Sequence, residues 1–325
     1  MLKKFTARPT DIRMSKHLTV RNHTRAQLRG YAIVPLMTPV TAGGQLDEPA
    51  VTRLVNHIID GGCQGLMVCG TTGEFASMSV AMRVRTVQVA LAAARGRAVV
   101  FGGIGDTCLD HTLTLAKEFF ASGVDAVVSN LPSYYPITAE MMERYFVDLA
   151  DRVGGPLYLY NIPQTTRLSI PLDVVERLSR HPRISGIKDS EPDTTRQEQL
   201  CRMFAGRDVF SVFCGTVPFA AKAMRAGADG FVPSGGNLAP LAARDLMDKL
   251  VSGDIEGGDA AQQRIEAINA IFQKGRTITQ SLAALKGTLE LAGLCGRHML
   301  SPNLPVTDAE LEAMRAPARE LGLIK

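Results

Sequence analysis

Short apolar runs alternate with longer amphipathic stretches along the chain from residue 30 onward. Each apolar run has four to six residues, is rich in β-branched or aromatic side chains and is bounded by Gly, Pro or Asp, which is typical of buried strands. The predicted strands are 31–36, 64–69, 98–103, 125–129, 156–160, 184–188, 208–213 and 229–232.

Amphipathic helices are predicted between these strands. Asp47, Glu48 and Pro49 form a typical helix start, and Gly61 follows the end of the same stretch. Strand and helix together repeat about every 28 residues. The predicted helices are 48–60, 79–95, 107–121, 138–151, 171–180, 192–204, 216–226 and 238–252.

This order predicts an α/β fold with a parallel sheet, because each strand is followed by a helix. Eight units in about 225 residues fit a (β/α)8 TIM barrel better than an open doubly wound sheet. Three further helices, at 256–274, 277–292 and 307–320, are expected to pack outside the barrel or against another subunit. The expected organisation is a leader over 1–29, a catalytic barrel over 30–253 and a C-terminal helical extension over 254–325.

Composition changes this picture mainly at the leader. The 325 residues are 46% apolar and 21% charged with a net charge of +4, which excludes a disordered or collagen-like chain. Residues 1–29 hold eight Lys and Arg side chains against one Asp, so they carry +7 and the remainder carries −3. We interpret the leader as a poorly ordered extension. The alternatives are an organellar transit peptide and a basic arm for nucleic acid.

The leader lacks the apolar segment of a secretory signal and the interleaved aromatic residues of a nucleic-acid-binding segment, so no nucleic-acid partner is expected. No apolar run approaches the roughly 18 residues of a membrane helix, so no membrane partner is expected either. The six cysteines are scattered without a C-x-x-C pair, which predicts reduced thiols in a cytoplasmic protein. The six histidines have no ligand spacing, and no metal site is predicted.

Catalytic side chains of such barrels lie at the carboxyl ends of the strands. After the second strand comes Gly70-Thr71-Thr72-Gly73-Glu74, in which two hydroxyls and free backbone N–H groups form either a carboxylate cradle or a simple capping turn. Tyr134 and Tyr135 lie on a Pro-bounded loop after the fourth strand, where packing is the favoured interpretation.

Lys188 ends the sixth apolar strand and is the sharpest chemical feature of the sequence. A lysine there either extends to solvent or acts as an amine, since loss of hydration favours the neutral form that attacks a ketone. Tyr160 ends the fifth strand and is placed to face the same mouth. Gly235 and Gly236 follow the eighth strand and leave a rival hypothesis open, a barrel that binds a phosphorylated ligand without Schiff-base chemistry.

Together these motifs resemble the dihydrodipicolinate synthase / N-acetylneuraminate lyase family over residues 30–300. The order and spacing are those of the family, including the 28-residue step from Tyr160 to Lys188. The matching segments are 70–74, 134–135, 160–163, 186–189, 227–230 and Asn237. The resemblance implies a Schiff-base lyase, a class I aldolase or hydro-lyase, that acts on pyruvate or a longer 2-oxo acid. It also implies a homotetramer built as a dimer of dimers, and no metal or organic cofactor.

The family resemblance also implies roles for individual residues. Lys188 would form the Schiff base, Tyr160 would shuttle protons near the imine, and Thr72 would relay protons to Tyr160. Tyr135 corresponds to a tyrosine that often reaches into the neighbouring subunit's site. Thr71, together with Thr72, would hold the substrate carboxylate.

Val232 corresponds to a residue whose backbone carbonyl faces the substrate, and Thr165 lies where true synthases usually carry an arginine for the second substrate's carboxylate. Arg167 comes two positions too late, and Met82 replaces a family glutamate. We therefore predict a catabolic or side-branch lyase that cleaves, condenses or dehydrates a 2-oxo acid, with Thr165 at the substrate. The alternative is an authentic 4-hydroxy-tetrahydrodipicolinate synthase, which joins pyruvate and aspartate semialdehyde in lysine biosynthesis. A non-catalytic protein that uses the basic leader to bind an acidic partner is a rival from another class.

Overall fold

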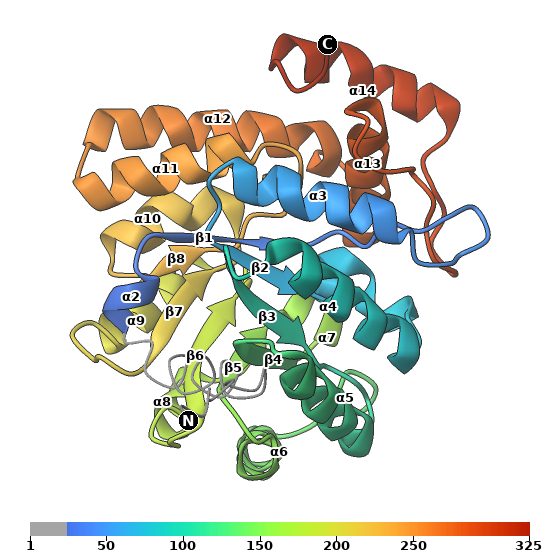
Figure 1. Cartoon of the computed structure of the whole chain (residues 1–325). Helices are drawn as coiled ribbons and strands as arrows, with labels where there is room; N and C mark the ends of the chain where they lie inside the picture. Colours follow the sequence, from blue (N-terminus) through green and yellow to red (C-terminus); the bar gives the residue numbers. More distant parts are fainter. Residues whose placement is uncertain (1–24) are drawn as a thin grey trace, which may run out of the picture.

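Eight parallel strands close into a barrel in the computed structural model, which describes residues 25–325. Each strand pairs with the next one along the chain, and β8 pairs with β1 (Figure 1). The predicted TIM barrel is therefore confirmed. The strands are β1 (Tyr31–Pro35), β2 (Gly65–Val68), β3 (Val99–Gly103), β4 (Ala126–Asn130), β5 (Leu157–Asn161), β6 (Ile184–Asp189), β7 (Ser211–Cys214) and β8 (Gly230–Phe231).

Helices connect the strands and surround the barrel in Figure 1. The major ones are α3 (Glu48–Asp60), α4 (Val80–Ala94), α5 (Leu109–Ser122), α6 (Ala139–Arg152), α8 (Leu172–Leu178), α9 (Thr194–Met203), α10 (Ala220–Arg225) and α11 (Pro240–Ser252). Short helical turns occupy several loops, namely η1 (Thr71–Gly73), η2 (Phe75–Ser77), α7 (Pro163–Thr166), η3 (Val217–Phe219) and η4 (Ser234–Asn237).

The start of β7 differs from the sequence prediction. The strand begins at Ser211 and not at residue 208. Phe210 stacks on Phe204 at 4.2 Å between ring centres, and Val209 is exposed. The apolar residues before β7 therefore belong to a turn that packs on the end of α9.

Side chains of alternating direction divide the core into two layers. One cluster lies inside the barrel and includes Ile33, Phe101, Tyr158 and Phe213. The larger cluster lies between the strands and the helices and includes their sequence neighbours, such as Val34 and Ile187. A strand residue in this fold therefore faces either the barrel interior or a helix.

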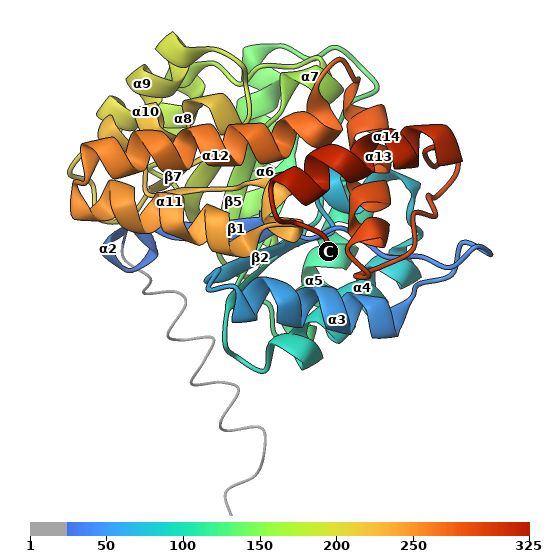
Figure 2. The ribbon, with the colours of Figure 1, turned by 90° about the horizontal axis from the view of Figure 1, so that it is seen from above.

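Three C-terminal helices complete the chain, α12 (Ile255–Gln273), α13 (Ile278–Leu291) and α14 (Asp308–Glu320). Gly253, at the boundary expected between barrel and extension, has φ +78° and ends α11, so that α12 returns beside it. Figure 2 shows α11 and α12 side by side, with α13 and α14 next to them. The extension shares the outer core cluster with the barrel, so the two are continuous in packing.

Residues 25–29 belong to the folded body and not to a poorly ordered leader. Arg25–Leu28 form the short helix α2, and Leu28 is buried within the cluster inside the barrel. Residues 1–24, the remainder of the expected leader, lie outside the described residues.

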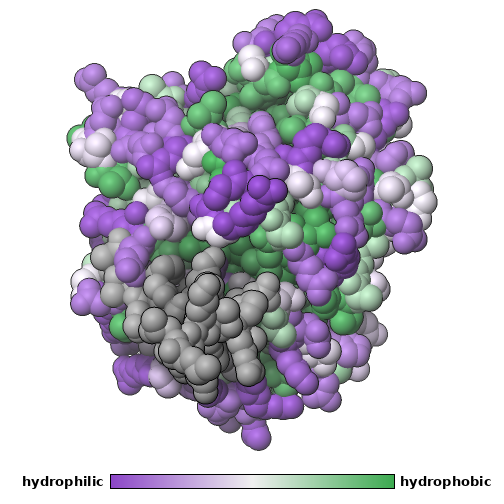
Figure 3. Space-filling model, in the orientation of Figure 1, coloured by the Kyte–Doolittle hydropathy of each residue, from purple (hydrophilic) through white to green (hydrophobic). Residues whose placement is uncertain are grey.

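The face shown in Figure 3 is largely hydrophilic, with apolar side chains in patches between the helices. Within residues 25–325, no helix combines the length and hydrophobicity needed to cross a membrane. Five of the six cysteines are buried, and Cys108 is exposed.

Candidate active site

A cavity of about 320 Å³ opens at the carboxyl ends of the strands. This volume is at the small end of the range for ligand sites, roughly 300–1,000 Å³. Lys188, Tyr160, Thr71, Thr72 and Val232 all line it. The structure thus brings most of the predicted site residues to one place.

The register of β5 and β6 places Tyr160 and Lys188 side by side. Leu157 pairs with Ile184, but Tyr158 pairs with Gly186, so one extra residue bulges between them. After this bulge Tyr160 lies opposite Lys188, and both side chains face the barrel interior.

Lys188 is 4% exposed and has few partners. Its Nζ lies 3.7 Å from the Met67 sulfur and 4.1 Å from the centre of the Tyr160 ring. No carboxylate within residues 25–325 forms an ion pair with it. A Cβ on Gly215 would lie 3.1 Å from the Lys188 side chain and 2.0 Å from the Ser190 hydroxyl, so glycine keeps this space open. An amine that is buried and has no ion-pair partner among the described residues is available to attack a carbonyl carbon.

The Thr71–Thr72 turn begins and ends on left-handed residues that are not glycine. Cys69 and Glu74 both have φ +58°, a conformation that a surrounding structure must enforce. The Thr71 hydroxyl lies 3.5 Å from the Tyr160 hydroxyl, while Thr72 is buried in the cavity wall. The hydroxyl that contacts Tyr160 therefore belongs to Thr71, whereas the resemblance implied Thr72 as the residue that relays protons to Tyr160.

Glu74 ties this turn to the C-terminal helices. One carboxylate oxygen accepts from Lys286 Nζ at 2.5 Å, and the other accepts from the backbone N–H of Leu300 at 3.0 Å and from the Asn303 amide at 3.2 Å. Both side chains of the ion pair are fully buried. Burial lowers the pKa of Lys286, and the charge of Glu74 opposes that change. The extension therefore fixes the turn that carries Thr71.

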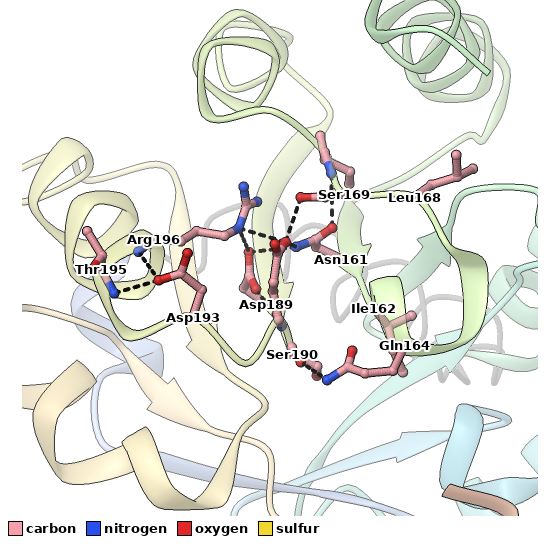
Figure 4. Close-up of polar contacts among 12 residues, drawn as sticks. Asn161, Ile162, Gln164, Leu168, Ser169, Asp189, Ser190, Asp193, Thr195 and Arg196 are labelled. Atoms are coloured by element: carbon pink, nitrogen blue, oxygen red, sulfur yellow. Dashed lines mark hydrogen bonds and ion pairs between the residues drawn. The ribbon is translucent and has the colours of Figure 1, made fainter. Parts of the chain in front are cut away.

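A second polar cluster holds the ends of β5 and β6 together behind the cavity (Figure 4). Asn161 donates to Asp189 at 3.1 Å and to Glu191 at 2.9 Å. Arg196 of α9 pairs with the same two carboxylates at 3.0 and 3.2 Å. Burial raises the pKa of Asp189, and the charge of Arg196 opposes that rise. Because Asn161 follows Tyr160 and Asp189 follows Lys188, this cluster fixes the strand ends that carry both.

Two predicted residues do not reach the cavity of their own chain. Tyr135 is 72% exposed and packs edge-to-face on Tyr134 at 4.9 Å between ring centres. Thr165 is exposed, and its hydroxyl donates to the Ile162 carbonyl at 3.3 Å. The neighbouring Gln164 lines the cavity instead and donates to the Ser190 carbonyl at 2.8 Å.

The Gly235–Gly236 turn is filled by side chains. A Cβ on Gly235 would lie 2.8 Å from Asn269, and one on Gly236 would lie 2.7 Å from Val34. Asn237 accepts from the Met37 N–H at 2.9 Å and donates to a β1 carbonyl at 2.8 Å. These glycines thus allow close packing against β1 and α12, which does not support the phosphate-binding alternative.

One wall of the cavity, contributed by the connection between α12 and α13, was not predicted from the sequence. The residues that line the cavity here are Gln273 at the end of α12, Arg276 in the connection, and Ile278 and Ser281 at the start of α13. A Gly275-Arg276 pair between two helices was the available signal. It could not be placed near the strand ends, because the extension was expected only to pack outside the barrel or against another subunit.

Comparison with known proteins agrees with this geometry. Residues 29–321 match the Dihydrodipicolinate synthetase family. A 4-hydroxy-tetrahydrodipicolinate synthase from Thermus thermophilus is 35% identical over 298 residues, which are 90% of this chain and 96% of that protein. The solved structure of YagE has a TM-score of 0.85 and 26% identity over 90% of this chain and 99% of its own.

YagE is a prophage protein of E. coli K12 from the dihydrodipicolinic acid synthase family, and its structure is a complex with pyruvate. A monomeric dihydrodipicolinate synthase variant shares the fold, with a TM-score of 0.84 at 24% identity over 91% of this chain and 98% of its own. Enzymes of the family are lyases that form a lysine Schiff base with pyruvate or a related 2-oxo acid and need no added cofactor. This chain belongs to the dihydrodipicolinate synthetase family and is a Schiff-base lyase of this kind.

Proposed function

We propose that Lys188 forms the Schiff base and that the enzyme cleaves, condenses or dehydrates a 2-oxo acid in a catabolic or side-branch reaction. The observation that carries the proposal is the Lys188 amine, buried without a carboxylate partner among the described residues and lying beside Tyr160. Small-molecule 2-oxo acids are the expected substrates. Thr71 and Thr72 would hold the substrate carboxylate, and the backbone carbonyl of Val232 would face the substrate.

In the proposed chemistry, Lys188 Nζ adds to the C2 carbonyl carbon, and loss of water leaves an iminium ion. Removal of a C3 proton, or cleavage of the C3–C4 bond of a 4-hydroxy substrate, sends an electron pair toward the iminium nitrogen and gives an enamine. In the cleavage the C4 hydroxyl loses its proton and C4 leaves as an aldehyde. Protonation of the enamine at C3 and addition of water to the imine then release the 2-oxo acid and restore the Lys188 amine. Tyr160 takes and returns the proton in these steps. The 3.5 Å contact supports Thr71 as the relay behind Tyr160.

The substrate is best tested by comparing two reactions of the natural enzyme. We expect pyruvate release from at least one 4-hydroxy-2-oxo acid, with a kcat/KM at least about tenfold above that for condensing pyruvate with aspartate semialdehyde. The reason is Thr165, which is exposed and supplies no cation where true synthases usually have one. The named relatives favour the alternative, 4-hydroxy-tetrahydrodipicolinate synthase activity. Efficient condensation by the natural sequence would establish that alternative and reject ours.

We propose that the enzyme assembles as a homotetramer of two tight dimers and acts in the cytoplasm, where its six cysteines stay reduced. Tyr134 and Tyr135 support the assembly, because two adjacent aromatic rings exposed by 78% and 72% form an apolar patch suited to burial by a second copy. In that arrangement Tyr135 would reach the neighbouring cavity.

Replacing Tyr135 by alanine should weaken the dimer and lower the rate of pyruvate C3 proton exchange by about tenfold or more, since the phenol that would reach the neighbouring cavity is lost. Sedimentation velocity and exchange of pyruvate methyl protons with D2O measure the two effects. Leu304→Ala, which trims another exposed apolar side chain, is the control. A wild-type monomer, or a Tyr135→Ala variant equal to wild type in both measurements, would argue against this assembly.

A further inference from the structure

The charged side chains that line the cavity are all positive among the described residues. Among the described residues that line it, Lys188 and Arg276 are the charged side chains, and none is acidic. Lys188 is committed to the C2 carbon of the substrate under the proposed function. Arg276 comes from the connection between α12 and α13, so a second cationic residue lines the same small cavity from a separate element. Such a site attracts a ligand that carries two anionic groups, or one anionic group placed several atoms away from C2.

The Arg276 guanidinium is held by a hydrogen bond and keeps further N–H groups that can donate to a ligand. Arg276 is half-buried, and its Nη1 donates to the Ile271 carbonyl at 3.0 Å. No carboxylate within residues 25–325 lies within ion-pair distance of it. The Glu310 carboxylate of α14 accepts from the backbone N–H and hydroxyl of Thr307 at 2.8 Å each. These hydrogen bonds lower the pKa of Glu310, and the positive charge of Arg276 lowers it further.

Further polar groups of the wall remain available to a ligand. The Thr216 hydroxyl is buried and has no hydrogen-bond partner in the part of the chain that the structure describes. Gln273 donates weakly to the Ser234 hydroxyl at 3.3 Å, and Ser281 lines the same side. The Thr216 hydroxyl therefore has a hydrogen bond left to form, which a polar group of a ligand in the cavity can supply.

We propose that Arg276 binds a carboxylate at the far end of the substrate, so that the preferred substrates are 2-oxo acids with a second carboxylate. This inference rests on the proposed function of Lys188. Arginine suits the role because its planar fork can donate two parallel hydrogen bonds to a carboxylate. Thr165, at the position of the usual family arginine, lies outside the cavity. Arg276 therefore acts as a specificity-determining residue from a different element.

The test uses two five-carbon 2-oxo acids that differ at C5, 2-oxoglutarate with a carboxylate and 2-oxopentanoate with a methyl group. Each is titrated against the protein in the presence of borohydride, and the adduct on the Lys188 peptide is measured by mass. Wild type should reach half-maximal labelling at about 10- to 100-fold lower concentration of 2-oxoglutarate, the value of a charge-assisted hydrogen bond. Arg276→Gln should remove this preference, and Arg276→Lys should retain part of it.

Lys274→Gln is the matched control, because Lys274 is an exposed cation on the same connection and does not line the cavity. It should keep the wild-type preference and label with pyruvate as well as wild type does. An unchanged preference in Arg276→Gln, no preference in wild type, or exclusion of 2-oxoglutarate would overturn the inference about Arg276. Failure of wild type to label with pyruvate would instead overturn the role of Lys188.

Discussion

Replacing Lys188 by alanine is expected to reduce pyruvate C3 proton exchange by about 10⁴-fold or more, because the covalent step disappears entirely. The exchange is measured as loss of the pyruvate methyl signal in D2O by NMR. It requires formation of the imine and the enamine, so it reports on both before any second substrate is known. Removal of the side chain from β6 leaves the polar cluster of Asn161, Asp189 and Arg196 intact, so the variant should fold.

Tyr160→Phe separates imine formation from proton transfer. The ring beside the Lys188 amine remains, while the hydroxyl that contacts Thr71 is lost. We expect labelling by pyruvate and borohydride to persist and exchange to fall by about 10²- to 10⁴-fold.

The control for Lys188→Ala is Lys222→Ala, which removes an exposed lysine on α10. Exchange that survives in Lys188→Ala would place the reacting amine elsewhere.

Breaking the buried pair between Glu74 and Lys286 is expected to have the largest effect on stability. Glu74→Gln leaves the Lys286 ammonium buried without its counter-charge, and we expect the free energy of unfolding to fall by about 3–5 kcal/mol. The same change should disturb the Thr71 turn, because the Glu74 carboxylate also holds the Leu300 N–H and the Asn303 amide. Urea unfolding followed by circular dichroism measures the stability.

The double variant Glu74→Gln with Lys286→Met supplies the comparison for this pair. Since it removes the stranded charge and keeps the volume of both side chains, its unfolding free energy should lie above that of Glu74→Gln alone. A loss below about 1 kcal/mol in Glu74→Gln, the typical value for an exposed ion pair, would show that this pair does not hold the turn.

Local pattern was sufficient to predict most of the fold. Short apolar runs alternate with amphipathic stretches in each unit, and α3, α4 and β3 lie within one or two residues of their predicted ends. The strand ends also identified Lys188 and Tyr160, because a barrel brings the carboxyl ends of its strands to one mouth. Both line the cavity.

Features that depend on non-local packing could not be predicted in this way. Which of the two threonines contacts Tyr160 is set by the left-handed residues Cys69 and Glu74, and Glu74 is held by residues more than two hundred positions away. The place of Arg276 depends on how α12 and α13 pack against the barrel, which no local pattern records. These two features carry the details of proton transfer and specificity.

The role of Lys188 is tested most directly by incubating the natural protein with pyruvate, reducing with borohydride and weighing its peptides. Reduction of the imine adds two hydrogens after loss of water, which corresponds to a gain of about 72 Da for pyruvate. We expect this gain on the peptide that contains Lys188, and no gain in Lys188→Ala. An unlabelled protein, or a label that persists in Lys188→Ala, would contradict it.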